Sequence, residues 1–299
     1  MRKIFLTVCA LFFCLLIVSC SGKVRFRVII DTDWAADDLR TICMLLSNSE
    51  VETLAISTSE GALKPADVAL KVSALLHHLQ REEIPVGVGR ALNIEPPVWR
   101  KQSEQIVWGN AANIVVPEQT AKDLITQTIE NEEEKITLIC LGTLTNLNDV
   151  LTANPELKTK IERVIWYNSS ASPLRGANYE ADPASADNVL ASGIRIDIIS
   201  GENNQEIAID RQYIDMIAHV DNIYAKKITE THNSGVLKPV VEFRHMRMWV
   251  DLVAIYLFAP ELFTSTGINK TVSLYSPANA DAAEQAKNIS IKILTGKRL

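Results

Sequence analysis

Residues 28–38 read Val-Ile-Ile-Asp-Thr-Asp-Trp-Ala-Ala-Asp-Asp, an apolar run followed by four carboxylates. The apolar run is typical of a buried strand. The residues after it carry apolar side chains at helical spacing, namely Leu39, Ile42, Cys43 and Leu46. The turn between strand and helix therefore lies at the carboxyl end of a strand, where open α/β sheets bind their ligands.

Helix capping accounts for one or two of these carboxylates but not for four. Asp31 and Asp33 are two residues apart, so they point the same way from an extended strand end. Asp37 and Asp38 fall at the helix start, where the dipole favours negative charge. Crowded carboxylates raise one another's pKa unless a cation lies among them, and Arg40 is the only basic residue nearby in sequence. We predict a bound divalent cation, Ca²⁺ in preference to Mg²⁺. The alternative is a solvated, capped helix start.

Two other Asp-rich motifs fit less well. An EF-hand loop needs Gly at its sixth position and Glu at its twelfth, where this chain has Ala36 and Ile42. Phosphatases of the haloacid dehalogenase type also place Asp-x-Asp after a strand. They normally have Thr or Val two residues beyond the second Asp, where this chain has Ala35.

The first twenty residues have the features of a targeting segment. Arg2 and Lys3 precede the apolar run Ile4–Val18, which is shorter than the ~20 residues of a membrane span and typical of a signal peptide. Cys20 follows a small residue, as at a bacterial lipoprotein cleavage site. We expect export and lipidation at Cys20, with anchoring to the bacterial cell envelope at the outer membrane. An unlipidated secretory signal and a retained membrane anchor are the alternatives.

The remaining residues, 21–299, are enough for one large domain. Hydrophobic residues make up 47% of the chain and charged residues 22%, as is usual for globular proteins. The net charge is −6, or −8 without Arg2 and Lys3, and no Lys/Arg block favours nucleic-acid binding. Cys43 and Cys140 lie in apolar patterns, so we expect buried thiols rather than a disulfide.

Predicted strands and helices alternate along the chain. This pattern predicts an α/β fold with an open, mainly parallel twisted sheet and helices on both faces. The expected further strands are 51–58, 85–88, 136–141, 161–167 and 194–200, and the expected helices begin at 65, 120, 145 and 183. Residues 92–114 lack periodicity and are expected to form a long covering loop with Trp99 and Trp108. From Asp210 onward we expect mostly helix.

Four separated stretches together resemble the nucleoside hydrolase family of the inosine–uridine preferring type. The first is the Asp-x-Asp-x-x-x-Asp-Asp spacing of residues 31–38. The second is Leu-Gly-Thr-Leu-Thr-Asn at 141–146, and the third is Asn-x-x-x-Asp-Pro at 178–183. The fourth is Val-Asp-Leu-Val-Ala at 250–254. The matches occur in the family's order and extend to about residue 263.

The resemblance implies a Ca²⁺-dependent hydrolase that cleaves the N-glycosidic bond of ribonucleosides to ribose and free base. It implies that Ca²⁺ is bound by Asp33, Asp38, Asp251 and the backbone carbonyl of Leu141. Asp33 would take a proton from the attacking water. Family members are often dimers or tetramers, so a homo-oligomer is also expected.

The resemblance assigns the other site residues to ribose and to the metal ligands. Asp37, Asn178 and Asp251 would contact ribose, and Asp31 would orient the residues that bind the metal. The transition state would carry positive charge on the sugar, which the acidic cluster would stabilise.

The chain departs from the family pattern at several positions. Trp34 and Ala35 replace Pro-Gly in the Asp loop, and Ala62 replaces an Asn that commonly touches the sugar. Gly176 stands where a Glu often contacts the 5′-hydroxyl, and Val250 where a His often protonates the leaving base. The metal half of the predicted site is intact, while the half for the 5′-hydroxyl and base is altered.

These departures leave three functional hypotheses. The first is an active ribonucleoside hydrolase with altered specificity, in which His245 supplies the acid or Trp34, Trp99 or Trp108 stacks on the base. A surface position for His245 and a packing role for the tryptophans are the alternative interpretations. The second is a hydrolase of a modified ribosyl substrate, and the third is a catalytically weak riboside-binding lipoprotein.

Overall fold

The computed structural model describes residues 24–171, 173–201, 207–243 and 246–299. The predicted targeting segment 1–20, the lipidation site Cys20 and the alternative acid His245 lie outside the described residues. Among the described residues, no helix is long and apolar enough to cross a membrane.

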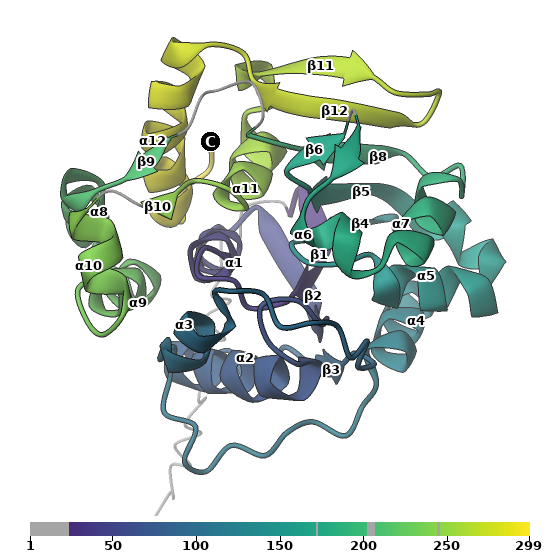
Figure 1. Cartoon of the computed structure of the whole chain (residues 1–299), viewed down its shortest axis with the longest axis horizontal. Helices are drawn as coiled ribbons and strands as arrows, with labels where there is room; N and C mark the ends of the chain where they lie inside the picture. The colour runs from purple at the N-terminus through teal and green to yellow at the C-terminus, as the bar shows by residue number, and fades with distance from the viewer. Residues whose placement is uncertain (1–23, 172, 202–206, 244–245) are drawn as a thin grey trace, which may run out of the picture.

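The architecture is a central sheet with helices packed on it (Figure 1). The sheet strands are β1 Phe26–Thr32, β2 Val51–Thr58, β3 Val86–Val88, β4 Ile136–Cys140, β5 Ile161–Tyr167, β8 Ile196–Ile199, β11 Phe263–Gly267 and β12 Val272–Pro277. Their order across the sheet is β11-β12-β8-β5-β4-β1-β2-β3. All neighbouring pairs are parallel except β11 and β12. The prediction of an open, mainly parallel sheet is confirmed.

The helices cover both faces of the sheet, as predicted. Their bounds are α1 Asp38–Ser47, α2 Pro65–Leu79, α3 Arg100–Gln105, α4 Ala121–Asn131, α5 Thr145–Ala153, α6 Ala177–Ala181, α7 Pro183–Leu190, α8 Arg211–Ala218, α9 Ile223–His232, α10 Leu237–Glu242, α11 Asp251–Phe258 and α12 Ala280–Leu294, with 3₁₀ turns at Pro155–Lys160 and Pro260–Leu262. Alternate strand residues enter two separate cores. One core includes α1, α2, α11 and α12, and the other includes α4, α5 and α7. This division follows from the two-residue period of a strand.

Strand β1 lies in the middle of the sheet, between β2 and β4. The chain leaves β1 toward β2 and β3 and then returns to place β4 on the other side of β1, so the order reverses between β1 and β4. Such a switch point opens a crevice at the carboxyl ends of the strands. Asp31, near the carboxyl end of β1, is paired with Ser57 of β2 and Cys140 of β4. The acidic loop that follows β1 therefore lies at this crevice.

After Asp210 the chain is mostly helical, as expected, but it also contains strands that the sequence pattern did not predict. Strands β11 and β12 extend the sheet beyond β8, and two short strands, β9 Ala208–Ile209 and β10 Met246–Arg247, pair antiparallel. A further short pair is β6 Ser170–Ala171 with β7 Leu174–Arg175. Residues 263–277 contain β-branched and aromatic side chains around a turn, which is a hairpin signal that the helical pattern on either side obscured.

The segment 92–114 covers the crevice side of the molecule, as expected, but it contains the short helix α3. Arg100 of α3 donates to the backbone carbonyls of Gly61 and Ala62 at 2.9 and 3.1 Å. The covering segment is therefore anchored directly to the loop after β2. Cys43 and Cys140 are free buried thiols, as predicted.

Candidate active site

The loop after β1 takes a path set by Trp34. This residue has a φ of +69°, which is rare for a large side chain and costs on the order of 1–3 kcal/mol. Its side chain is fully buried and stacks on the ring of Trp108. Proline cannot adopt this φ, so the loop differs locally from a Pro-Gly loop. Trp34 and Trp108 pack against each other and are not available to stack on a base.

Asp33 and Asp38 each keep one carboxylate oxygen without a partner. Asp33 Oδ2 accepts a hydrogen bond from the Ala62 N–H at 2.8 Å, and its Oδ1 is buried and unpaired. Asp38 Oδ2 accepts from the Thr32 hydroxyl and from the Trp34 N–H, and its Oδ1 is also buried and unpaired. Unpaired buried acceptors are costly, so this pair of oxygens is suited to a bound ligand.

Asp31, in β1, is bonded to side chains of β2 and α5. Its Oδ2 accepts from the Ser57 hydroxyl at 2.6 Å and from the Asn146 amide at 2.7 Å. Asn146 also donates to the carbonyl of Thr58, so it ties the ends of β1 and β2 to the start of α5. Asp31 is therefore held by its neighbours and supports the loop.

Burial shifts the acidity of the whole cluster. It raises the pKa of Asp31, Asp33 and Asp37 to about 6. The charge of Asp31 adds to the shift of Asp33. Burial also raises the pKa of Asp38 well above its usual range, and the charges of Asp33 and Asp37 raise it further. The cluster therefore resists ionisation unless a positive charge is nearby.

Asp37 and Asp251 lie on the other side of the loop. Asp37 Oδ2 accepts from the backbone N–H of Val250 at 3.0 Å. Asp251 is the first residue of α11 and is fully buried. Both of its oxygens accept from Arg40 of α1, from Nε and Nη2, each at 2.7 Å. Sequence reasoning noted Arg40 as the nearby cation but did not pair it with Asp251, because the two lie far apart in sequence.

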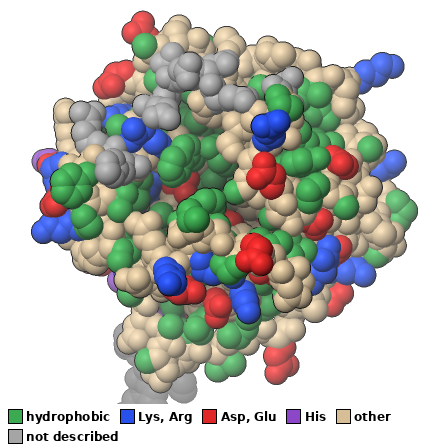
Figure 2. All heavy atoms as spheres, viewed as in Figure 1, with side chains coloured by type: hydrophobic (Ala, Val, Ile, Leu, Met, Phe, Trp, Pro, Cys, Tyr) green, Lys and Arg blue, Asp and Glu red, His purple; other side chains and the backbone are tan. Residues whose placement is uncertain are grey.

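A pocket of about 470 Å³ opens beside the loop. It is lined by Asp33, Ala35, Ala36, Asp37, Trp99, Gln102, Ser103, Leu141, Tyr167, Ser169, Ala177, Asn178, Val240, Met246, Trp249 and Val250. Figure 2 shows a hollow on this face, bordered by hydrophobic side chains with acidic side chains inside it. The pocket brings together Asp33, Asp37, Leu141 and Asn178, four of the predicted site residues. Asp31, Asp38 and Asp251 do not line it.

A second hollow of about 470 Å³ adjoins the pocket and shares Asp33, Trp99 and Asn178 with it. It adds two acidic residues, Glu95 and Glu180. Glu180 accepts from the Gly176 N–H at 3.3 Å, so a carboxylate lies close to the position where the family's Glu is missing. The loss of Glu at position 176 therefore does not leave this side without an acidic group.

The side chain of Asn178 is fixed by hydrogen bonds to two backbone carbonyls. Its amide nitrogen donates to the carbonyls of Leu141 and Tyr167 at 2.7 and 2.9 Å. The Leu141 carbonyl, a predicted metal ligand, thus already accepts one hydrogen bond and keeps a second lone pair.

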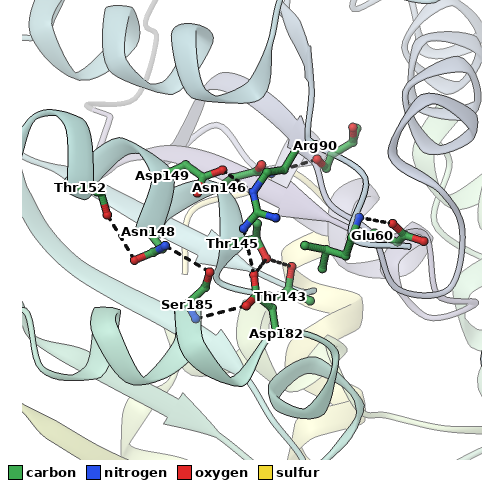
Figure 3. Close-up of polar contacts among 12 residues, drawn as sticks. Glu60, Arg90, Thr143, Thr145, Asn146, Asn148, Asp149, Thr152, Asp182 and Ser185 are labelled. Carbon is green, nitrogen blue, oxygen red and sulfur yellow. Dashed lines mark hydrogen bonds and ion pairs between the residues drawn. The ribbon is translucent and has the colours of Figure 1, made fainter. Parts of the chain in front are cut away.

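Figure 3 shows how the second and third motifs are joined. Asp182 accepts from the Thr145 hydroxyl at 2.6 Å and from Arg90 at 3.3 Å, and it caps α7 through the Ser185 N–H. Thr145 belongs to the Leu-Gly-Thr-Leu-Thr-Asn stretch and Asp182 to Asn-x-x-x-Asp-Pro. This network positions α6, which carries Asn178, beside the end of β4.

Sequence reasoning missed several residues that line the pocket. Gln102, Tyr167, Ser169 and Trp249 contribute amide, hydroxyl and aromatic groups to it. Burial raises the pKa of Tyr167, and the charges of Asp37 and Asp251 raise it further, so its phenol stays protonated as a donor. Its position at the end of β5, beside β4, is the signal that could have identified it.

The four predicted Ca²⁺ ligands fit a cation unequally. Asp33 and Asp38 have free buried oxygens, and the Leu141 carbonyl has a free lone pair. Asp251 does not fit, because Arg40 already bonds both of its oxygens. Among the residues that the structure describes, no three His, Cys, Asp or Glu side chains converge as a metal site.

Comparison with solved structures gives the same fold. A plant nucleoside hydrolase superposes with a TM-score of 0.74 at 20% identity, covering 91% of this chain and all of that one. An inosine-uridine preferring nucleoside hydrolase from Bacillus anthracis superposes with a TM-score of 0.73 at 17% identity, with 91% and 100% coverage.

Comparison with known protein sequences gives relatives that are named as pyrimidine-specific ribonucleoside hydrolases. A pyrimidine-specific ribonucleoside hydrolase, RihA, of Shewanella sp. (strain MR-7) is 28% identical over 214 residues, which are 68% of this chain and 67% of that protein. RihA of Shewanella woodyi is 26% identical over 255 residues, or 80% and 81% of the two chains. The family model of the inosine-uridine preferring nucleoside hydrolases matches residues 28–294. The chain therefore belongs to this family of hydrolases that act on N-glycosyl compounds.

Proposed function

We propose that this protein hydrolyses the N-glycosidic bond of ribonucleosides, giving ribose and the free base. The observation that carries the proposal is the pocket at the β1–β4 switch point, where Asp33, Asp37 and Asn178 line one cavity and Asp33 keeps a free oxygen. The relatives act on pyrimidine ribonucleosides by name. We extend that substrate class to this chain.

Asp33 acts as the general base in this proposal. Its pKa of about 6 leaves it ionised at neutral pH and a stronger base than an ordinary carboxylate. The bond from the anomeric carbon to the base nitrogen breaks, and a bond to the water oxygen forms. Asp33 takes one proton from the attacking water and later returns it to solvent, and the departing base gains one proton from solvent. Asp37 and Asn178 bind ribose hydroxyls, and the acidic cluster stabilises positive charge on the sugar.

Ca²⁺ dependence is part of the proposal, with a reduced set of ligands. Asp33, Asp38 and the Leu141 carbonyl would hold the cation, because they alone among the predicted ligands have free acceptors. When bound, the cation would neutralise the repelling carboxylates and polarise the attacking water.

The base side of the pocket offers donors but no strong acid. Apart from Asp33 and Asp37, its described lining residues include no Asp, Glu or His, and its polar groups are those of Gln102, Ser103, Tyr167 and Ser169 among others. Trp99 and Trp249 are 41% and 43% exposed and provide aromatic faces at the pocket. We propose that the base is bound by these side chains and assisted by the Tyr167 hydroxyl.

Turnover of three substrates tests this function. Inosine, uridine and p-nitrophenyl β-riboside are compared with Ca²⁺ and with EDTA. Nitrophenolate leaves without an acid, so it reports on the ribose half alone. We expect turnover of at least one nucleoside. Absence of turnover on all three contradicts the proposal.

Replacing Asp33 with Asn tests the general base. We expect turnover to fall about 10³-fold, within the usual range for losing a general base. The exposed Asp67→Asn on α2 is the matched control and should retain full activity. Wild-type turnover in Asp33→Asn contradicts the mechanism.

Replacing Tyr167 with Phe tests assistance to the base. We expect nucleoside turnover to fall about 10²-fold while nitrophenyl riboside turnover stays near wild type, because only the nucleoside needs a donor. An equal loss on both substrates indicates a structural role instead.

A second function is favoured by one observation, the lack of a strong acid on the base side. A protein with this pocket could bind ribosides without cleaving them. Tight ribose or nucleoside binding by calorimetry without turnover identifies this function.

Export and anchoring through a lipid on Cys20 remain a proposal that rests on the sequence of residues 1–20. Metabolic labelling with palmitate tests it in the bacterium. The label should be present in the full chain and absent in Cys20→Ala.

A homo-oligomer remains a prediction that light scattering can test.

A further inference from the structure

The Arg40–Asp251 ion pair lies at the edge of the acidic site, and every N–H group of the Arg40 guanidinium has an acceptor. Arg40 is 1% exposed and Asp251 is fully buried. Apart from Asp38 and Thr41, the other buried residues of α1 are apolar, so a buried guanidinium there needs a reason beyond packing.

All the donors of Arg40 have acceptors. Nε and Nη2 each donate one hydrogen bond to the Asp251 carboxylate. Nη2 also donates to the backbone carbonyl of Arg247 at 3.3 Å. Nη1 contacts His232 Nε2 at 2.9 Å and Met246 Sδ at 3.0 Å. The five N–H groups of the guanidinium therefore have five acceptors. We call these acceptors, from Asp251, Arg247, His232 and Met246, the cage of Arg40.

His232 is part of this cage only as a neutral ring. Its Nδ1 lies 2.8 Å from the Ile228 carbonyl and donates to it, so Nε2 is the acceptor for Arg40. The cage is specific for a positive guest at the position of the guanidinium.

We propose that Arg40 is a resident cation that takes the place of a divalent metal at Asp251 and so weakens metal binding at Asp33 and Asp38. A Ca²⁺ site gains affinity with each charged oxygen ligand, and the Arg40 ion pair withholds one. This inference rests on the Ca²⁺ site proposed above and adds the residue that controls its strength.

The test is Ca²⁺ binding by isothermal titration calorimetry, with no substrate present. In Arg40→Met, Asp251 loses its counter-ion and becomes free to bind Ca²⁺. We expect this variant to bind Ca²⁺ about tenfold or more tightly than wild type. Its melting temperature should also fall in EDTA much more than that of wild type.

Two further variants serve as controls. Arg40→Met combined with Asp251→Asn removes both charges, and its Ca²⁺ affinity should match wild type. Arg163→Met breaks a partly buried ion pair, with Asp197 at 3.3 Å, outside the pocket. It should not gain Ca²⁺ affinity.

Two results overturn the proposal. One is Ca²⁺ binding by Arg40→Met that is no tighter than in wild type. The other, which remains decisive if Arg40→Met does not fold, is a tenfold or greater loss of affinity in the double variant. That loss means that Asp251 binds the metal in wild type. Nucleoside turnover is measured separately. Turnover without an affinity gain rejects this inference alone, and an affinity gain without turnover rejects the proposed activity alone.

Discussion

The two sides of the acidic loop differ in how their charge is balanced. On one side, Asp33 and Asp38 are bonded by backbone and hydroxyl donors and keep free oxygens. On the other side, Asp251 is saturated by a guanidinium. The same residue type therefore serves two purposes within one site. The first side keeps buried acceptors without a partner, and the second carries its own counter-ion.

The largest expected effect comes from applying one substitution to both sides. Asp251→Asn leaves Arg40 buried without a counter-charge and should lower the free energy of unfolding by about 3–5 kcal/mol. Asp38→Asn removes a carboxylate whose pKa is strongly raised by burial, so at pH 7 it should leave stability unchanged or increase it. Urea unfolding in EDTA measures both. Equal losses in the two variants contradict the comparison.

A smaller effect is expected from a change that reaches only the Asp33 side. A Cβ on Gly61 would lie 1.9 Å from Asp33 Oδ2, so Gly61→Ala must displace that carboxylate. We expect kcat/KM for the best substrate to fall about 10²-fold, as for a misplaced reacting group. Gly267→Ala, whose Cβ meets nothing within 4 Å, is the matched control. Unchanged kinetics in Gly61→Ala argue against a role for the Asp33 position.

The smallest effect concerns the Asp251 side and depends on pH. Burial and, to a smaller extent, the charge of Arg40 lower the pKa of His232 from 6.5 to about 3. The unfolded chain therefore takes up a proton below pH 6.5 that the folded protein cannot take up until about pH 3. This contribution to stability is complete above pH 6.5 and is lost as the pH falls.

The measurement compares wild type with His232→Gln at pH 7 and pH 5. Wild type should lose about 2 kcal/mol more than the variant over this interval. The acidic residues with pKa values near 6 are common to both proteins, so their opposite contribution cancels in the difference. A pH dependence that is the same in both proteins would falsify the assignment of a neutral His232.

The sheet could be predicted from sequence because local patterns determine it. The apolar strand β1, the Pro65 helix start and the Asp182-Pro183 cap are each visible within a few residues. The hairpin of β11 and β12 was missed because β11 is largely exposed and the helical patterns on either side obscured the signal of its two strands.

Part of the site could also be predicted, because some of its residues lie in local sequence patterns. Asp33, Asp37, Leu141 and Asn178 were found because they follow strands or lie in short motifs, and they do line one pocket. The ion pair of Asp251 was not found, since spacing along the chain says nothing of a partner on another helix. Tyr167 was missed because an aromatic side chain in an apolar strand resembles a core residue, and its position at the carboxyl end of β5 was the one signal that pointed to the pocket.

The length of chain between Arg40 and Asp251 has a consequence for folding. The two residues are 211 positions apart, so α1 leaves the ribosome long before α11 is made. Contacts of such separation form slowly, because a long stretch of chain must first be ordered. Until α11 docks on α1, the nascent protein holds a guanidinium with no counter-ion and an incomplete pocket wall. Docking of α11 therefore completes both the fold and the site, and a chain interrupted before residue 251 remains unfinished in both respects.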